Sequence, residues 1–330
     1  MERFSVQSRD ADETPQARQA TVTTTARLHF GFLDPSGRGK RPFGSFGLSI
    51  DRPRTKLTLK RAQDLRVSGT EHDRAERYLR RIADSCGTRQ AYALHIEEAI
   101  PSHAGLGSGT QLALAVGSAF AVLEGIKLSP QEIAKRLERG TRSGIGIATF
   151  ALGGAVLDGG PRQGKLPELL TRVPFPPGWR VLLILDANYS GLTGANEREA
   201  FEALPDFPES ESEALRRRIT ESALPALAKD DFKTFCDEIG HLQSCMGRYY
   251  APVQGGAFAS PRVSKVLDWL RDNGIAGLGQ SSWGPTGFAF VASEAEGKVV
   301  LDEAEARHSQ PGLSFILVQG RNEGARIETD

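Results

Sequence analysis

Cysteine is scarce in this sequence, and its spacing argues against several kinds of site. The 330 residues include three cysteines, Cys86, Cys236 and Cys245, and no two of them form a C-x-x-C pair. The spacing does not favour a zinc or dithiol site, and the odd number does not favour a disulfide framework. We expect reduced, mostly structural thiols, as in cytosolic proteins.

Net charge and long apolar runs are missing as well. Lysine plus arginine number 41, as do aspartate plus glutamate, so no overall field draws the protein to nucleic acid or an anionic membrane. The longest strongly apolar strand-like run, Val181–Leu185, is far too short to span a bilayer. Residues 1–20 lack the apolar segment of a secretory signal and are expected to form a disordered polar tail. The sequence therefore predicts a cytoplasmic protein without a membrane or nucleic-acid partner.

The remaining residues predict an α+β fold in two domains. In the first part, strands are expected over 21–34, 48–51, 55–60, 92–97 and 153–160, and helices over 72–86, 111–125, 129–139 and 143–152. The stretch VPFPPGW, residues 173–179, contains three prolines and is taken as the boundary between domains 21–172 and 173–330.

The second domain has the pattern of a split sheet. Strands are expected over 180–186, 274–280, 286–292 and 313–318, and helices over much of 194–249, over 260–272 and over 293–307, with an acidic loop at 206–213. This β-α-β-β-α-β order is typical of ferredoxin-like domains.

Residues 101–115, PSHAGLGSGTQLALA, connect a strand to an apolar helix through three alternate glycines. Glycine permits positive φ and lets backbone N–H groups converge on an anion, and Ser108 and Thr110 can add hydroxyl donors at the helix N-terminus. The loop lacks the lysine of a Walker A motif and the spacing of G-x-G-x-x-G. The alternative is an ordinary tight turn with Ser108 as the helix N-cap.

The pattern P-x-x-x-G-L-G-S in this loop resembles the second signature of the GHMP kinase superfamily. The resemblance implies a GHMP-kinase-like two-domain fold, with an N-terminal ribosomal-S5-domain-2-like domain, a C-terminal ferredoxin-like domain, and a loop that wraps phosphates. Residues 277–291, GLGQSSWGPTGFAFV, lie where the last signature of that superfamily normally occurs. The implied phosphate- or pyrophosphate-binding residues are His103, Gly105, Leu106, Gly107, Ser108, Gly109, Thr110 and Ser143.

One position argues against a kinase. Several GHMP kinases carry an aspartate in a stretch that here reads SGIGIATFALGG, residues 143–154, and Gly146 occupies the position of that aspartate. Glycine cannot orient or deprotonate an attacking alcohol. An ATP-dependent small-molecule kinase remains an alternative function, because some members of the superfamily lack this base. A regulatory protein that only binds ligands is a third.

A narrower resemblance accounts for the missing aspartate. The segments ARLHFGFLD (26–34), PSHAGLGSGTQLALA (101–115), RGTRSGIGIATFALGG (139–154) and VLDGG (156–160) resemble the β-ribofuranosylaminobenzene 5′-phosphate synthase family. This implies a decarboxylating phosphoribosyltransferase of tetrahydromethanopterin biosynthesis. It would join phosphoribosyl pyrophosphate to 4-aminobenzoate or 4-hydroxybenzoate and release CO₂ and pyrophosphate. The resemblance also implies Mg²⁺, brought by the pyrophosphate substrate, and a homodimer.

Four residues are the catalytic candidates under this hypothesis. Arg142 can bind phosphate or carboxylate with its planar guanidinium, or be a surface arginine at a helix end. Arg27 and His29 share one face of a strand and can hold the 5′-phosphate or the benzoate, although a lone strand histidine is often structural. Asp34 can ligate Mg²⁺, stabilise the ribosyl cation, or simply form a turn before Pro35. The metal ligands are left open.

Overall fold

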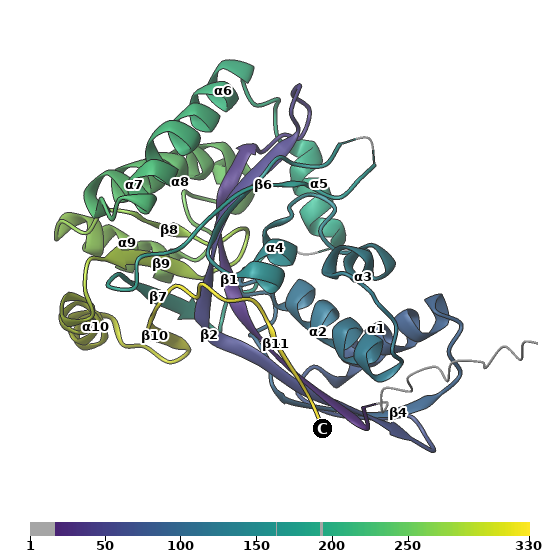
Figure 1. Cartoon of the computed structure of the whole chain (residues 1–330). Helices are drawn as coiled ribbons and strands as arrows, with labels where there is room; N and C mark the ends of the chain where they lie inside the picture. Colours follow the sequence, from purple (N-terminus) through teal and green to yellow (C-terminus); the bar gives the residue numbers. More distant parts are fainter. Residues whose placement is uncertain (1–16, 163, 192–193) are drawn as a thin grey trace, which may run out of the picture.

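The computed structural model describes residues 17–162, 164–191 and 194–330 (Figure 1). Most of the predicted polar tail, residues 1–16, lies outside the described residues; its last two residues do not belong to a tail, because the first strand already begins at Gln19. Among the described residues, no helix has the length and apolar character needed to cross a membrane.

The first sheet is built on a long antiparallel ribbon. Its elements are β1 (Gln19–Asp34), β2 (Phe43–Ala62), β3 (Arg66–Gly69), α1 (His72–Ser85), β4 (Ala91–Glu98), α2 (Ser108–Leu123), α3 (Pro130–Arg136), α4 (Ile145–Leu152), β5 (Ala155–Asp158) and β6 (Leu169–Val173). The two strands expected at 48–51 and 55–60 are one continuous strand, β2, because β1 pairs along nearly its whole length. β4 pairs with the second half of β2 and β5 with the first half.

Helix α2 lies at the centre of the first half of the molecule. Most residues of α2 are buried along its whole length, whereas Gly109 and Thr110 in its first turn are only partly buried. A helix that is apolar on nearly every side is held rigidly by its surroundings. The first turn of α2 is therefore both fixed in place and accessible.

The second half forms the predicted ferredoxin-like sheet. Its elements are β7 (Arg180–Asp186), α5 (Gly194–Ala203), α6 (Glu209–Arg218), a π-helical turn (Ile219–Ala223), α7 (Leu224–Ala228), α8 (Phe232–Gln254), α9 (Pro261–Asp272), β8 (Leu278–Gln280), β9 (Gly287–Val291), α10 (Glu294–His308) and β10 (Leu313–Val318). The strand order β10-β7-β9-β8, with every neighbouring pair antiparallel, is that of a β-α-β-β-α-β unit.

One expectation for this half is wrong in detail. The acidic stretch 206–213 is not a loop throughout, because α6 begins at Glu209. Acidic side chains in a first helical turn favour the positive end of the helix dipole, so the charge pattern is a helix start. In addition, the last strand, β11 (Arg326–Thr329), pairs with β1, so the end of the chain returns to the first sheet.

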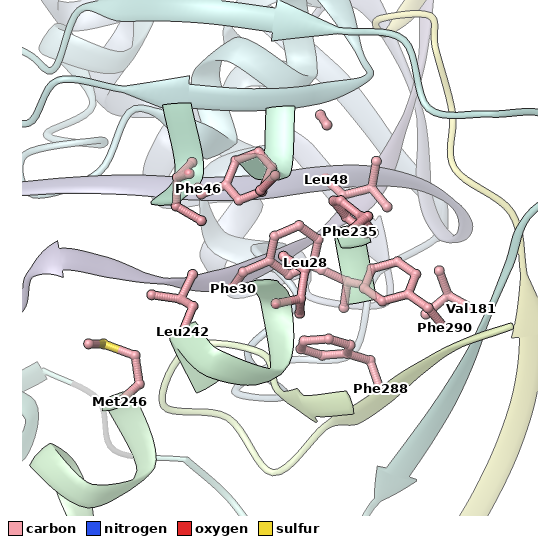
Figure 2. Packing of buried hydrophobic residues seen from close by; sticks show 14 of the residues in the cluster. Leu28, Phe30, Phe46, Leu48, Val181, Phe235, Leu242, Met246, Phe288 and Phe290 are labelled. Atoms are coloured by element: carbon pink, nitrogen blue, oxygen red, sulfur yellow. The ribbon is translucent and has the colours of Figure 1, made fainter. Parts of the chain in front are cut away.

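The two sheets share one hydrophobic core. Phe30 of β1 contacts Phe46 of β2 and also Phe288 and Phe290 of β9, and Phe235 of α8 contacts Phe290 (Figure 2). The ring centroids of Phe30 and Phe46 are 5.2 Å apart, and those of Phe30 and Phe288 are 5.4 Å apart. Aromatic side chains bury large areas. This contact fixes the two halves against each other where the loop at 101–107 lies.

Candidate active site

The glycine-rich loop has the backbone that its sequence predicts. Gly105 and Gly107 have φ of 79° and 82°, values that side chains with a Cβ rarely adopt. A Cβ on Gly105 would lie 2.2 Å from the carbonyl oxygen of Ser281, so this position has no room for a side chain. Gly107 is the N-cap of α2, and Ser108 is its first residue. The alternative of Ser108 as an N-cap is therefore wrong.

Arg27 holds the loop against β1. Its backbone N–H donates to the carbonyl oxygen of Leu106 at 3.1 Å, and its guanidinium Nη1 donates to that of Gly105 at 2.5 Å. Burial lowers the pKa of Arg27 to about 10, so the side chain remains a cation at neutral pH. Arg27 thus places a positive charge directly beside the loop.

A segment from the second half of the chain completes the loop. The hydroxyl of Ser281 donates to the carbonyl oxygen of Gly105 at 2.8 Å and accepts from the backbone N–H of His29 at 3.0 Å. A Cβ on Gly284 would lie 2.2 Å from the Gly105 nitrogen. The glycine-rich stretch at 277–291 therefore lies in contact with the first glycine-rich loop, although it lacks a dense glycine run.

The position that lacks the kinase aspartate faces the first turn of α2. A Cβ on Gly146 would lie 3.0 Å from Cγ2 of Thr110. The buried Gln111 fixes this contact, since its Nε2 donates to the carbonyl oxygen of Gly146 at 2.8 Å. The N-termini of α2 and α4 therefore converge. The first N–H groups of a helix have no partner within it and carry partial positive charge, so both ends favour an anion.

Ser143 belongs to a buried polar cluster at the start of α4. Its Oγ lies 2.6 Å from Oγ of Ser45 and donates to Asp158 at 3.3 Å. Asp158 is only 1% exposed and also accepts hydrogen bonds from the backbone N–H groups of Gly144 and Gly160, both at 2.8 Å. Burial raises the pKa of Asp158, and these hydrogen bonds oppose the rise. The hydroxyl of Ser143 therefore holds the 143–146 turn in place.

The structural role of Asp158 was not predicted, although its segment, VLDGG, belongs to the family pattern. An acid at the end of a buried strand, followed by two glycines, was the available signal, because a buried carboxylate needs several donors close by.

Arg142 lies in the connection between α3 and α4. Its guanidinium carbon is 4.6 Å from the centroid of the Phe201 ring of α5, a cation–π arrangement. Helix α3 already ends at Arg136, so the alternative of an arginine that ends a helix is wrong. Arg142 is half-buried between the two halves of the molecule.

Asp34 and His103 have contacts of different kinds. Asp34 is buried and accepts hydrogen bonds from the Ser36 hydroxyl at 2.6 Å and the Gly39 backbone N–H at 2.9 Å. A turn residue makes contacts of this kind, which agrees with the alternative that Asp34 forms a turn before Pro35. His103 has a φ of 58° and is exposed. Its carbonyl oxygen accepts from the N–H of Gly191 at 3.2 Å.

His29 lies on the same strand as Arg27 in a different environment. Its ring is 3% exposed and packs edge-on against Phe32, with centroids 4.7 Å apart. Burial, followed by the nearby charge of Arg27, lowers the pKa of His29 to about 3. The imidazole is therefore neutral in the folded protein over the physiological range.

Two further arginines that the sequence did not single out flank the loop. A Cβ on Gly109 would lie 3.7 Å from Nη2 of Arg139 and 3.8 Å from Nη1 of Arg74. Arg139 stacks over the ring of Tyr78 at 5.2 Å and donates to its hydroxyl, and Arg74 pairs with Glu71 at 3.0 Å. Together with Arg27, they surround the start of α2 with positive charge.

Comparison with known proteins agrees with this architecture. Residues 73–154 match the family model of the GHMP kinases N terminal domain, and residues 223–310 match that of the GHMP kinases C terminal domain. The homoserine kinase structure from Cytophaga hutchinsonii superposes with a TM-score of 0.66 at 16% identity, covering 99% of this chain and 100% of that one. A likeness at this identity concerns the fold.

The similarity to curated relatives covers nearly the whole chain. The β-ribofuranosylphenol 5′-phosphate synthase of Methanothermobacter thermautotrophicus is 27% identical over 92% of this chain and 97% of its own length. The protein of the same name from Archaeoglobus fulgidus is 29% identical over 93% of this chain and 99% of its own length. With both domain matches and the shared fold, the chain belongs to the GHMP kinase superfamily, and the curated relatives that it resembles over nearly its whole length are named β-ribofuranosylphenol 5′-phosphate synthases.

Proposed function

We propose that the protein transfers the ribosyl phosphate of phosphoribosyl pyrophosphate to 4-hydroxybenzoate or 4-aminobenzoate, with loss of CO₂ and pyrophosphate. The observation that carries the proposal is the environment of the 105–110 loop. Arginines surround the loop, and a glycine, Gly146, faces it where a kinase would present a carboxylate. The names of the archaeal relatives support the same reaction class.

The chemistry begins with departure of the diphosphate. The bond between ribose C1 and the diphosphate oxygen breaks, the electron pair leaves with the diphosphate, and positive charge develops on the ribose. Backbone N–H groups at the start of α2 and the cation of Arg27 stabilise the leaving group. Such donors are worth most where they are fixed beforehand, and the hydrogen bonds from Arg27 and Ser281 to Gly105 fix this loop.

The aromatic acceptor then attacks through the ring carbon that carries the carboxylate. A bond forms between this carbon and ribose C1, and the bond to the carboxylate breaks. The electrons of that bond restore aromaticity, and CO₂ leaves. No proton has to be removed from the ring, so the step needs no general base at position 146.

Mg²⁺ is expected to arrive bound to the diphosphate. Mg²⁺ usually takes one or two protein carboxylates together with phosphate oxygens and water. Within the described ranges, no group of three histidine, cysteine or acidic side chains is placed to hold a metal. The positive charge of an ion carried by the substrate would lower the free-energy cost of diphosphate departure.

A labelling experiment tests the proposal. The protein is incubated with phosphoribosyl pyrophosphate, Mg²⁺ and either acid labelled in its carboxyl group. We expect labelled CO₂ and pyrophosphate in equal amounts, and no label released when phosphoribosyl pyrophosphate is omitted. Absence of labelled CO₂ with both acids would contradict the proposal, and ATP consumption that depends on an alcohol would support the kinase alternative.

The pathway and the assembly are part of the same proposal. We place the reaction in tetrahydromethanopterin biosynthesis, in the cytoplasm, and we expect a homodimer. Light scattering on the eluting protein measures its mass, which for a dimer is twice that of the 35.7 kDa chain.

A further inference from the structure

The loop at 105–110 faces different cations at its two ends. Beside Gly107, a Cβ would lie 3.2 Å from Nε of Arg27. Beside Gly109, a Cβ would lie 3.7 Å from Nη2 of Arg139 and 3.8 Å from Nη1 of Arg74. Residues two apart in a helix are about 5.5 Å from each other, a spacing that one diphosphate can bridge. The loop therefore offers two neighbouring places for a phosphate.

The cations beside Gly109 exceed the acids that could balance them. Arg74 forms an ion pair with Glu71 at 3.0 Å. Arg139 has no carboxylate at ion-pair distance within the part of the chain that the structure describes, and its neighbour in the sequence, Glu138, pairs with Arg81. A partly buried cation without an acidic partner favours an anionic ligand.

Several guanidinium donors around the loop also have no hydrogen-bond partner. Nε of Arg27, of Arg74 and of Arg139 is buried and unpaired among the described residues. Buried polar atoms are nearly always paired in folded proteins. Because a guanidinium only donates, the missing partner has to be an acceptor. A diphosphate has oxygen atoms enough to accept from all three arginines, whereas a single water molecule has two lone pairs.

The end of the loop at Gly109 is open to a ligand. Gly109, Thr110, Arg74 and Arg139 are all only partly buried, so solvent reaches them. At Gly105 the backbone of the second half fills the place of a Cβ. At Gly109 the neighbouring atoms are instead the ends of flexible arginine side chains, which can shift to admit a phosphate oxygen.

The position of the second half of the chain gives the diphosphate a direction. Arg27 lies on the side of that half, because Arg27 and Ser281 both donate to the carbonyl oxygen of Gly105. Arg142 also contacts that half, through Phe201. In Figure 1, helix α1, which carries Arg74, lies farther from the second sheet than β1 does. A ribose held between the halves therefore points the free end of its diphosphate at α1.

We propose that Arg74 and Arg139 bind the terminal phosphate of the diphosphate, while Arg27 binds the phosphate attached to the ribose. The inference rests on the proposed function and adds the direction in which the ribosyl donor lies along the loop. It assigns Arg74 and Arg139 as the residues that distinguish a diphosphate from a single phosphate.

The test removes the terminal phosphate from the ligand and, separately, the arginines from the protein. Calorimetry in the presence of Mg²⁺ compares phosphoribosyl pyrophosphate with ribose 1,5-bisphosphate, which lacks only the terminal phosphate. We expect the unsubstituted protein to bind the diphosphate at least about tenfold more tightly. Arg74→Gln and Arg139→Gln should each weaken its binding by about tenfold and that of ribose 1,5-bisphosphate by less than about twofold. Arg27→Gln should weaken both ligands.

Controls separate this inference from a loss of folding. Arg77→Gln, an exposed arginine on α1, should leave both affinities unchanged, and thermal melting shows whether each variant folds. If a glutamine variant does not fold, Arg74→Lys and Arg139→Lys keep the charge without the planar fork and should still lose affinity for the diphosphate alone. Equal weakening of both ligands, or no weakening of either, in the Arg74 and Arg139 variants would overturn the inference.

Failure of the proposed function gives a different result. A protein that binds the two ligands in this pattern but releases no CO₂ with either acid would contradict the proposed reaction and leave the inference standing. Release of CO₂ by a protein whose Arg74 and Arg139 variants bind both ligands normally would do the opposite. Pyrophosphate compared with inorganic phosphate repeats the test without the ribose, and binding of none of these ligands would overturn both proposals.

Discussion

Arg27 and His29 lie two residues apart on one face of β1, yet their surroundings are opposite. Arg27 is a cation that donates to the loop backbone, and Arg74 and Arg139 are close to the same loop. His29 is neutral, lies among aromatic rings, and has two unpaired nitrogens among the described residues. Over a short length of one strand, the protein changes from a surface suited to an anion to one suited to an aromatic group. The sheet thus positions two chemically different binding regions next to each other.

The largest expected effect comes from removing the charge of the first region. Arg27→Ala should lower kcat/KM by about 100-fold or more, because a fixed donor beside the leaving group is lost. Arg27→Lys should recover part of the loss, and Arg77→Ala, an exposed arginine on α1, serves as the control. Steady-state kinetics with either acid measures the change. If Arg27→Ala and Arg77→Ala behaved alike, the distinction between the two regions would not hold.

A smaller loss is expected from adding negative charge to the first region. Gly146→Asp should lower kcat/KM by about tenfold or more, because its side chain presses on Thr110 and repels the diphosphate. Gly146→Ala keeps the steric contact without the charge and should lose less. The same assay with ATP and candidate alcohols should detect no kinase activity in Gly146→Asp. Equal losses in the two variants would assign the effect to packing alone.

Asp158 affects stability more than specificity. Its pKa is raised in the folded protein, so as pH increases the unfolded chain releases this proton first, and the contribution of Asp158 to stability falls. That fall should begin near the ordinary aspartate pKa, about 4, and end above the raised value. Asp158→Asn cannot titrate and should lack this component, and it should destabilise the protein by about 1–3 kcal/mol by mismatching the donors. Urea unfolding at several pH values measures both; an unchanged pH profile would contradict the assignment.

The smallest effect is expected at His103. His103 is exposed, and replacing an exposed side chain usually has little effect, so His103→Ala should change kcat/KM by no more than about twofold. A loss comparable with that of Arg27→Ala would place His103 in the anion region.

The elements with strong periodicity were predictable from the sequence. The helix expected over 72–86 is α1, whose buried residues recur at helical spacing (Ala75, Tyr78, Leu79, Ile82 and Ala83), and β10 has the predicted bounds. The short strands β3 and β6 were missed, because four or five residues with charged neighbours carry little pattern.

The backbone of the 105–110 loop was predictable, because its glycines lie in one contiguous stretch of the sequence. Arg27 was predicted as a candidate but not as a contact of this loop, from which it lies far away in the sequence. Arg74 and Arg139 were not identified, because each reaches the region only through the packing of distant elements, and the pairing state of the His29 nitrogens depends on such packing as well. Local patterns cannot report contacts that tertiary packing creates.

The hydrogen bonds of Ser281 have a consequence for folding while the protein is being translated. The ribosome releases the glycines of the 105–110 loop long before it reaches Ser281, yet the loop depends on that hydroxyl for one of its anchors. A nascent chain that ends before this point carries every residue of the motif without the clamp that holds it. The ability to bind diphosphate should therefore be acquired late in translation, when nearly the whole polypeptide has emerged.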